Sequence, residues 1–259
     1  MKKIVAVLLV VLMILSCFAG CGKKSDSDLA YIKDKGVLVV GITDYAPMDY
    51  KDENGEWTGF DAEFAQLVAK ELGVECEFYV LADWGKKFYE LETKNIDVIW
   101  NGMTITDEVK LNTNCSDPYV VNAQVVVMKA DVVGNYPDAA SMVDLTFAVE
   151  NGSAGQDAAT AIGAENIVAV QDQAAALMEV AAGTADACVI DITMANAMTG
   201  EGTSYADLAA GISLTSEEYG IGFRKDSDVT AKVNEIMAKF MKDGTLQALA
   251  DKYSLTLAG

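Results

Sequence analysis

The segment 96–106 constrains the fold of this chain more than any other. It begins as an apolar run, 96–100, and breaks into a small polar turn, 101–104, with the sequence Asn-Gly-Met-Thr. A short apolar run bounded by a glycine-containing turn is typical of a buried strand. Open α/β sheets bind ligands at the carboxyl ends of their strands. We therefore expect this turn to form one wall of a cleft for a small molecule.

Strand-like and helix-like patterns alternate on both sides of that segment. Before and through it, the patterns predict strands at 37–41, 74–80 and 96–100, a hairpin around Asn54-Gly55, and helices over 60–72 and after Asp83. After it, they predict strands at 124–128, 145–149, 167–170, 187–190 and 219–223, and helices over 156–162, 173–182, from about 229 to 243, and 245–253. This order predicts an open, mostly parallel α/β sheet in each of two similar lobes.

The N-terminus has the pattern of an export signal. Lys2 and Lys3 precede an apolar run of about twelve residues, and Ala19-Gly20 then lead to Cys21. The run is shorter than the roughly 20 residues that span a bilayer. We therefore expect residues 1–20 to be a signal peptide that resembles those of bacterial lipoproteins, Cys21 to be lipidated, and 21–28 to be a flexible tether. Cleavage without a lipid, or lipidation at Cys17, is the alternative.

Composition excludes several classes of function. Asp and Glu number 39 against 19 Lys and Arg, and the formal net charge is −20, which repels phosphate backbones, so no nucleic-acid partner is expected. The chain has no histidine, which excludes His-based catalytic triads and His metal ligands. Cys76, Cys115 and Cys188 match no zinc spacing, and we expect buried thiols at Cys76 and Cys188. We therefore expect neither a metal nor a cofactor.

Five stretches together resemble one protein family. They are 50–61 (YKDENGEWTGFD), 101–108 (NGMTITDE), 116–119 (SDPY), 219–225 (YGIGFRK) and 242–246 (KDGTL). In this order they resemble the extracellular solute-binding proteins of bacterial ABC amino-acid importers, the polar amino-acid group. The resemblance implies the type II periplasmic-binding-protein fold, with lobe 1 at 29–121 plus 218–259, lobe 2 at 122–217, and two hinge strands. It also implies a monomer at the outer face of the cytoplasmic membrane that delivers an amino-acid-like ligand to permease subunits.

The same resemblance implies which residues bind the ligand. Asp191 matches the aspartate that binds the ligand ammonium, although it could also cap the following helix. The aromatic residues Tyr45 and Trp84 match those that sandwich the ligand side chain, although Trp84 could simply pack in the core. Two further segments match those that offer backbone and hydroxyl groups to the ligand: Asn101, Gly102, Met103 and Thr104, and Ser153, Ala154 and Gly155. Asp44 is also matched to the site, in a loop that is one residue shorter than usual.

One position departs from the family pattern. Val109 stands where the family usually has an arginine that grips the ligand carboxylate, and Lys110 is one residue out of phase. Arg224 is expected to be a solvated charge. We therefore expect either that N–H groups and Thr104 hold the carboxylate, or that the ligand is not a conventional free α-amino acid.

Two other functions remain open from the sequence. Dehydratases that act on cyclic amino-acid precursors share the fold, and such an enzyme would need an acid with a raised pKa in the cleft, for which Asp44 and Asp191 are candidates. A ligand-sensing subunit of a signalling system is the third possibility. We expect a binding protein rather than an enzyme.

Overall fold

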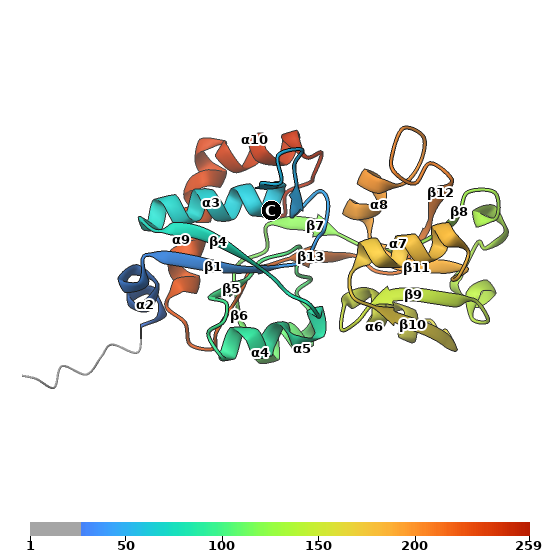
Figure 1. Cartoon of the computed structure of the whole chain (residues 1–259), viewed down its shortest axis with the longest axis horizontal. Coiled ribbons are helices and arrows are strands. Elements are labelled where there is room, and N and C mark those ends of the chain that lie inside the picture. The colour runs from blue at the N-terminus through green and yellow to red at the C-terminus, as the bar shows by residue number, and fades with distance from the viewer. Residues whose placement is uncertain (1–26) are drawn as a thin grey trace, which may run out of the picture.

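The computed structural model describes residues 27–259, which form two α/β lobes side by side (Figure 1). The expected signal peptide, Cys21 and most of the expected tether lie outside the described residues. Within 27–259, no helix is long and apolar enough to cross a membrane.

The first lobe is built on a five-stranded sheet with the order β4-β1-β5-β14-β6. Its strands are β1 (Val37–Ile42), β4 (Glu75–Val80), β5 (Val98–Ile99), β6 (Asn114–Cys115) and β14 (Gly222–Phe223). β1 pairs in parallel with β4 and β5, whereas β14 runs antiparallel to β5 and β6. Helices pack around this sheet, and β2 (Tyr50–Lys51) and β3 (Trp57–Thr58) form the expected hairpin. The helices are α2 (Asp28–Lys35), α3 (Phe60–Leu72), η1 (Trp84–Lys86), α4 (Lys87–Glu92), α5 (Asp107–Asn112), α9 (Val229–Asp243) and α10 (Thr245–Lys252).

The second lobe has the same plan. Its sheet has the order β10-β9-β11-β8-β12, in which β9, β10 and β11 are parallel and β8 is antiparallel to β11 and β12. The strands are β8 (Gln124–Lys129), β9 (Thr146–Glu150), β10 (Asn166–Val170), β11 (Ala187–Asp191) and β12 (Leu208–Ser213). The helices are η2 (Val133–Asn135), η3 (Ala139–Met142), α6 (Ala154–Ala161), α7 (Gln173–Ala182) and α8 (Ile192–Met198). The expected two-lobed α/β architecture is thus confirmed.

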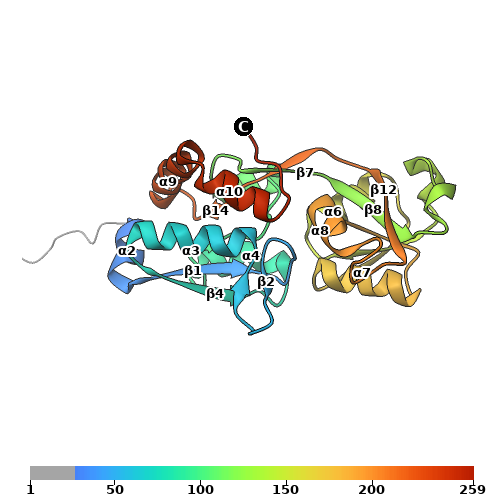
Figure 2. The same ribbon diagram turned by 90° about the horizontal axis from the view of Figure 1, so that it is seen from above.

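Two strands connect the lobes. β7 (Val120–Asn122) and β13 (Glu217–Tyr219) pair antiparallel, with Glu217 opposite Asn122 and Tyr219 opposite Val120. Figure 2 shows β7 leading from one lobe to the other, and Figure 1 shows β13 in the same gap. Because few segments cross between the lobes, rotation about these two strands can open and close the space between them.

Three features of the first lobe differ from what the sequence pattern predicts. Helix α2 begins at Asp28, where the sequence predicts a tether, and the Ser27 side chain caps it. The stretch expected to be one strand at 219–223 is split into β13 and β14. Arg224 is not solvated: its guanidinium binds Asp28 and Asp97 and donates to the carbonyl oxygens of Leu91 and Ile96. It therefore fastens α2 and α4 to the sheet rather than facing a ligand.

Candidate functional site

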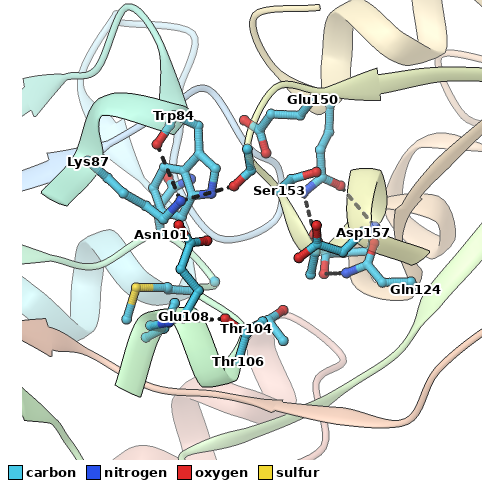
Figure 3. Close-up of a pocket in the computed structure, with 17 residues that line it drawn as sticks. Trp84, Lys87, Asn101, Thr104, Thr106, Glu108, Gln124, Glu150, Ser153 and Asp157 are labelled. Atoms are coloured by element: carbon cyan, nitrogen blue, oxygen red, sulfur yellow. Dashed lines mark hydrogen bonds between the residues drawn. The ribbon is translucent and has the colours of Figure 1, made fainter. Parts of the chain in front are cut away.

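A cavity lies between the two lobes at the carboxyl ends of β5, β9 and β11. The space between protein atoms there is about 430 Å³, including the part that is open to solvent. The first lobe contributes the turn after β5 together with η1, α4 and α5, and the second contributes the loop after β9 with α6, α7 and β11. Figure 3 shows side chains from both lobes converging on it. Its lining residues are Trp84, Lys87, Asn101, Gly102, Met103, Thr104, Thr106, Glu108, Val109, Gln124, Glu150, Gly152, Ser153, Ala154, Asp157, Gln173 and Asp191.

The turn after β5 forms one wall, and its polar groups are fixed by the first lobe. The Asn101 side chain accepts from the Thr43 N–H at 2.8 Å and donates to the Thr43 hydroxyl at 2.7 Å. The Gly102 N–H donates to the Asp61 carboxylate at 2.6 Å. The Thr104 hydroxyl donates to Glu217 at 2.7 Å. These bonds hold the wall rigid, but they also engage the hydroxyl that the sequence suggests as a carboxylate donor.

Asp191 lies on the opposite wall as the last residue of β11, almost fully buried. Amide groups of Asn122, Gln124 and Gln173 donate to its two carboxylate oxygens. Burial, followed by the charge of Glu217, raises its pKa to about 7 against the lowering effect of hydrogen bonds such as that from Gln173. Its side chain makes no capping bond to α8, although it stands at the position before the helix. The carboxylate is therefore an acceptor fixed in the cavity wall, which suits a cationic group.

Trp84 lines the cavity and also packs in the core. The side chain is 6% exposed and lies in an apolar cluster with Leu81, Leu91 and Val109. Asp83 caps this turn by accepting from the Gly85 N–H at 3.0 Å. Both suggested roles for Trp84 are thus compatible with its position.

The loop after β9 supplies the start of helix α6. Ser153 is the N-cap, and its hydroxyl accepts from the Gln156 N–H at 3.2 Å. Ser153 and Ala154 line the cavity. Gly155 is not among the lining residues. A side chain there would meet the Val189 carbonyl oxygen at 2.6 Å, so this glycine allows α6 to pack closely on β11.

Asp44 and Tyr45 also lie outside the cavity lining. Asp44 is exposed. The Tyr45 ring is 2% exposed, and its hydroxyl lies 2.5 Å from both the Thr193 hydroxyl of the second lobe and the Tyr219 hydroxyl of β13. In this arrangement Tyr45 joins the two lobes rather than facing the cavity.

Two further contacts join the lobes at the cavity. The Asn151 amide donates to Asp83 at 2.9 Å, and the Lys87 ammonium donates to the Gly152 carbonyl oxygen at 3.0 Å. Together with the Tyr45–Thr193 contact, they indicate that the structure represents a closed arrangement of the lobes.

Several lining residues are not predicted from the sequence, among them Lys87, Gln124, Glu150 and Gln173. Glu150 is almost fully buried, its Oε1 atom has no partner among the described residues, and burial, followed by the charge of Asp191, raises its pKa well above the usual value. It ends β9 as Asp191 ends β11, so the end-of-strand rule could have identified it. No comparable signal marks Lys87, because its burial depends on the second lobe.

The described residues contain no group of His, Cys, Asp or Glu side chains placed to hold a metal ion. Cys76, Cys115 and Cys188 are free thiols. Burial raises the pKa of Cys76 to about 12, so this thiol is unreactive at neutral pH.

Comparisons with known proteins agree with this geometry. The profile of the bacterial extracellular solute-binding proteins, family 3, matches residues 38–256. The chain is 30% identical over 247 residues to the L-cystine-binding protein TcyJ of Escherichia coli K12, covering 93% of this chain and 92% of that one. It is 30% identical over 257 residues to the arginine-binding extracellular protein ArtP of Bacillus subtilis, covering 95% and 96%.

Solved structures show the same likeness. Holo ArgBP from T. maritima superposes with a TM-score of 0.77 at 33% identity, over 86% of this chain and 98% of that one. The ancestral amino-acid-binding protein AncCDT-1, described as a precursor of cyclohexadienyl dehydratase, superposes with a TM-score of 0.80 at 33% identity, over 88% and 99%. The chain therefore belongs to family 3 of the bacterial extracellular solute-binding proteins.

Proposed function

We propose that this protein captures one amino acid between its lobes and delivers it to the permease of an ABC importer. The observation that carries the proposal is the cavity itself. One wall offers a fixed carboxylate, Asp191, and the other groups include the start of helix α6 and a buried ammonium, Lys87. These are complementary to the two charges of a zwitterion. The relatives described above bind amino acids, which supports the same class of ligand.

The direct test is calorimetry with the standard L-amino acids, L-ornithine and L-cystine. We expect one compound, or a few close analogues, to bind one to one at micromolar or lower Kd and to be recovered unchanged. Binding of none of them would contradict the proposal.

A dehydratase-like enzyme is the second candidate, because Asp191 and Glu150 are cavity acids with raised pKa. Three amide groups, however, donate hydrogen bonds to Asp191. Such donors stabilise the ionised carboxylate, which is a hydrogen-bond acceptor and not a proton donor. Consumption of the bound compound on prolonged incubation would favour the enzyme.

We also propose that lipid on Cys21 anchors the protein at the outer face of the cytoplasmic membrane. The support is the sequence of the first 21 residues. In cells, Cys21→Ala is expected to move the protein from the membrane fraction to the soluble fraction, since a diacyl anchor is what retains it. Ser25→Ala is the control and should leave the distribution unchanged. A Cys21→Ala protein that stays with the membrane would contradict the anchor.

A further inference from the structure

Lys87 is the one cationic side chain among the described residues that line the cavity. It begins α4, and only 3% of it is exposed. Glu108, Glu150, Asp157 and Asp191 also line the cavity, so Lys87 is the single positive side chain in an acidic site. Neighbouring Lys86 points to solvent, with 68% of its side chain exposed.

The Lys87 ammonium has neutral partners only. It donates to the carbonyl oxygens of Trp84 at 3.4 Å and Gly152 at 3.0 Å, and it lies 4.8 Å and 4.7 Å from the ring centroids of Trp84 and Phe88. No carboxylate of the described residues lies within ion-pair distance of it, although Lys35, Lys94 and Arg224 elsewhere have such partners. An ammonium has three N–H groups, and a buried charge is costly without a counter-charge. A ligand anion would supply what this group lacks.

A second source of positive potential lies beside it. Gly152, whose carbonyl oxygen accepts from Lys87, immediately precedes Ser153, the N-cap of α6. The first N–H groups of a helix have no acceptor within the helix, and they favour anions. The ammonium and the start of α6 therefore face the same part of the cavity. Val109, by contrast, contributes an apolar side chain that belongs to the cluster around Trp84.

The acids are arranged to receive the other charge of the ligand. Figure 3 shows Lys87 on one side of the cavity and Gln124, which donates to Asp191, on the other. Glu150, with its unpaired oxygen, lies in the second lobe at the end of β9. Resting on the proposed amino-acid-binding function, we propose that Lys87 binds the ligand carboxylate together with the start of α6, while the ligand ammonium faces Asp191. The ligand class is then an amino acid with a free carboxylate.

The test combines a variant with a chemical change in the ligand. Calorimetry is run on the wild type, Lys87→Met and Lys86→Met, using the tightest-binding compound of the panel above and its carboxamide. Losing a charge-assisted pair in a closed site is expected to weaken binding by at least about 30-fold. The wild type should therefore prefer the acid over the amide by at least about 30-fold, and Lys87→Met should bind the two within about threefold. Lys86→Met should behave as the wild type, because that side chain lies outside the cavity.

Each outcome separates this inference from the function on which it rests. Tight binding of the acid by the wild type, with Lys87→Met equally tight, overturns the role of Lys87 and leaves the function standing. Equal affinity of the wild type for the acid and its carboxamide overturns the role of Lys87 without any variant. It indicates that the protein recognises the ligand without its carboxylate. A wild type that binds no compound of the panel overturns the function and this role together.

Discussion

Asp191→Asn is expected to weaken ligand binding by about 2–5 kcal/mol, which is roughly 30-fold to several thousandfold in Kd. The substitution keeps the shape of the side chain but removes the charge that we propose faces the ligand ammonium. It also replaces one acceptor oxygen by a donor. That donor would face the amide group of Gln173 if it replaces Oδ2, or those of Asn122 and Gln124 if it replaces Oδ1. Calorimetry with the tightest-binding amino acid measures the change.

Asp186→Asn is the matched control for this variant. Asp186 is exposed, precedes the same strand β11 at its other end, and accepts from the Thr146 N–H at 2.8 Å. It should bind the ligand within about twofold of the wild type, since surface substitutions have small effects. Equal affinity of Asp191→Asn and Asp186→Asn would show that the buried carboxylate does not contact the ligand.

The same carboxyl group makes binding depend on pH. Its pKa in the free protein is about 7, and a bound ammonium favours the ionised form and so lowers that pKa. Below pH 7, binding then releases a proton, and the affinity should fall as pH falls, by at most about tenfold per unit for one group.

The stability of the free protein should depend on pH in the opposite direction. Because the pKa of Asp191 is raised in the folded state, its contribution to the free energy of unfolding is present below about pH 4 and is lost as pH rises through 7. In Asp191→Asn, its share of both dependences should disappear.

Gly102→Ala is expected to lower the free energy of unfolding by about 2–4 kcal/mol. Gly102 has a φ of +55°, which side-chain-bearing residues rarely adopt, and a Cβ there would lie 2.6 Å from the Tyr45 ring and 3.2 Å from the Tyr219 ring. Both rings are buried and tied to each other and to Thr193 by their hydroxyl groups, so they cannot turn away. The turn itself would have to shift, which should also weaken ligand binding.

Gly55→Ala separates backbone strain from the clash. Gly55 has a φ of +82°, but a Cβ there meets nothing within 4 Å. Its cost should be only about 1 kcal/mol, since the positive φ is the sole penalty. Urea denaturation of both variants measures the difference, and equal destabilisation would refute the close packing of Gly102 against the two tyrosines.

The sequence predicts best those elements whose signals are local. Helix α7 begins and ends where the apolar pattern and Gly183 place it, and α3 ends before Gly73, which adopts a left-handed backbone as helix C-caps often do. Helix α2 is not predicted, because half of its residues are charged and it is held through Arg224, nearly two hundred residues away. Strand β12 is also missed, because its small residues lack the apolar alternation of a strand.

The site shows the same division between local and distant causes. Polar residues that end strands or start helices can be located from the sequence. Asn101, Ser153 and Asp191 are predicted in this way, and all three line the cavity. The position of Tyr45 depends on Thr193, and the burial of Lys87 depends on Gly152, so neither follows from its neighbours in the chain. The sequence marks the missing arginine at Val109, whereas only the structure shows that a lysine of another helix enters the same cavity.

Mass spectrometry of small molecules released from gently purified protein tests whether the cavity holds an amino acid. We expect one retained compound, about one per protein, that carries a primary ammonium and a free carboxylate and that calorimetry then shows to bind reversibly. A retained compound that lacks either charged group, or one converted to product by the protein, would contradict this expectation.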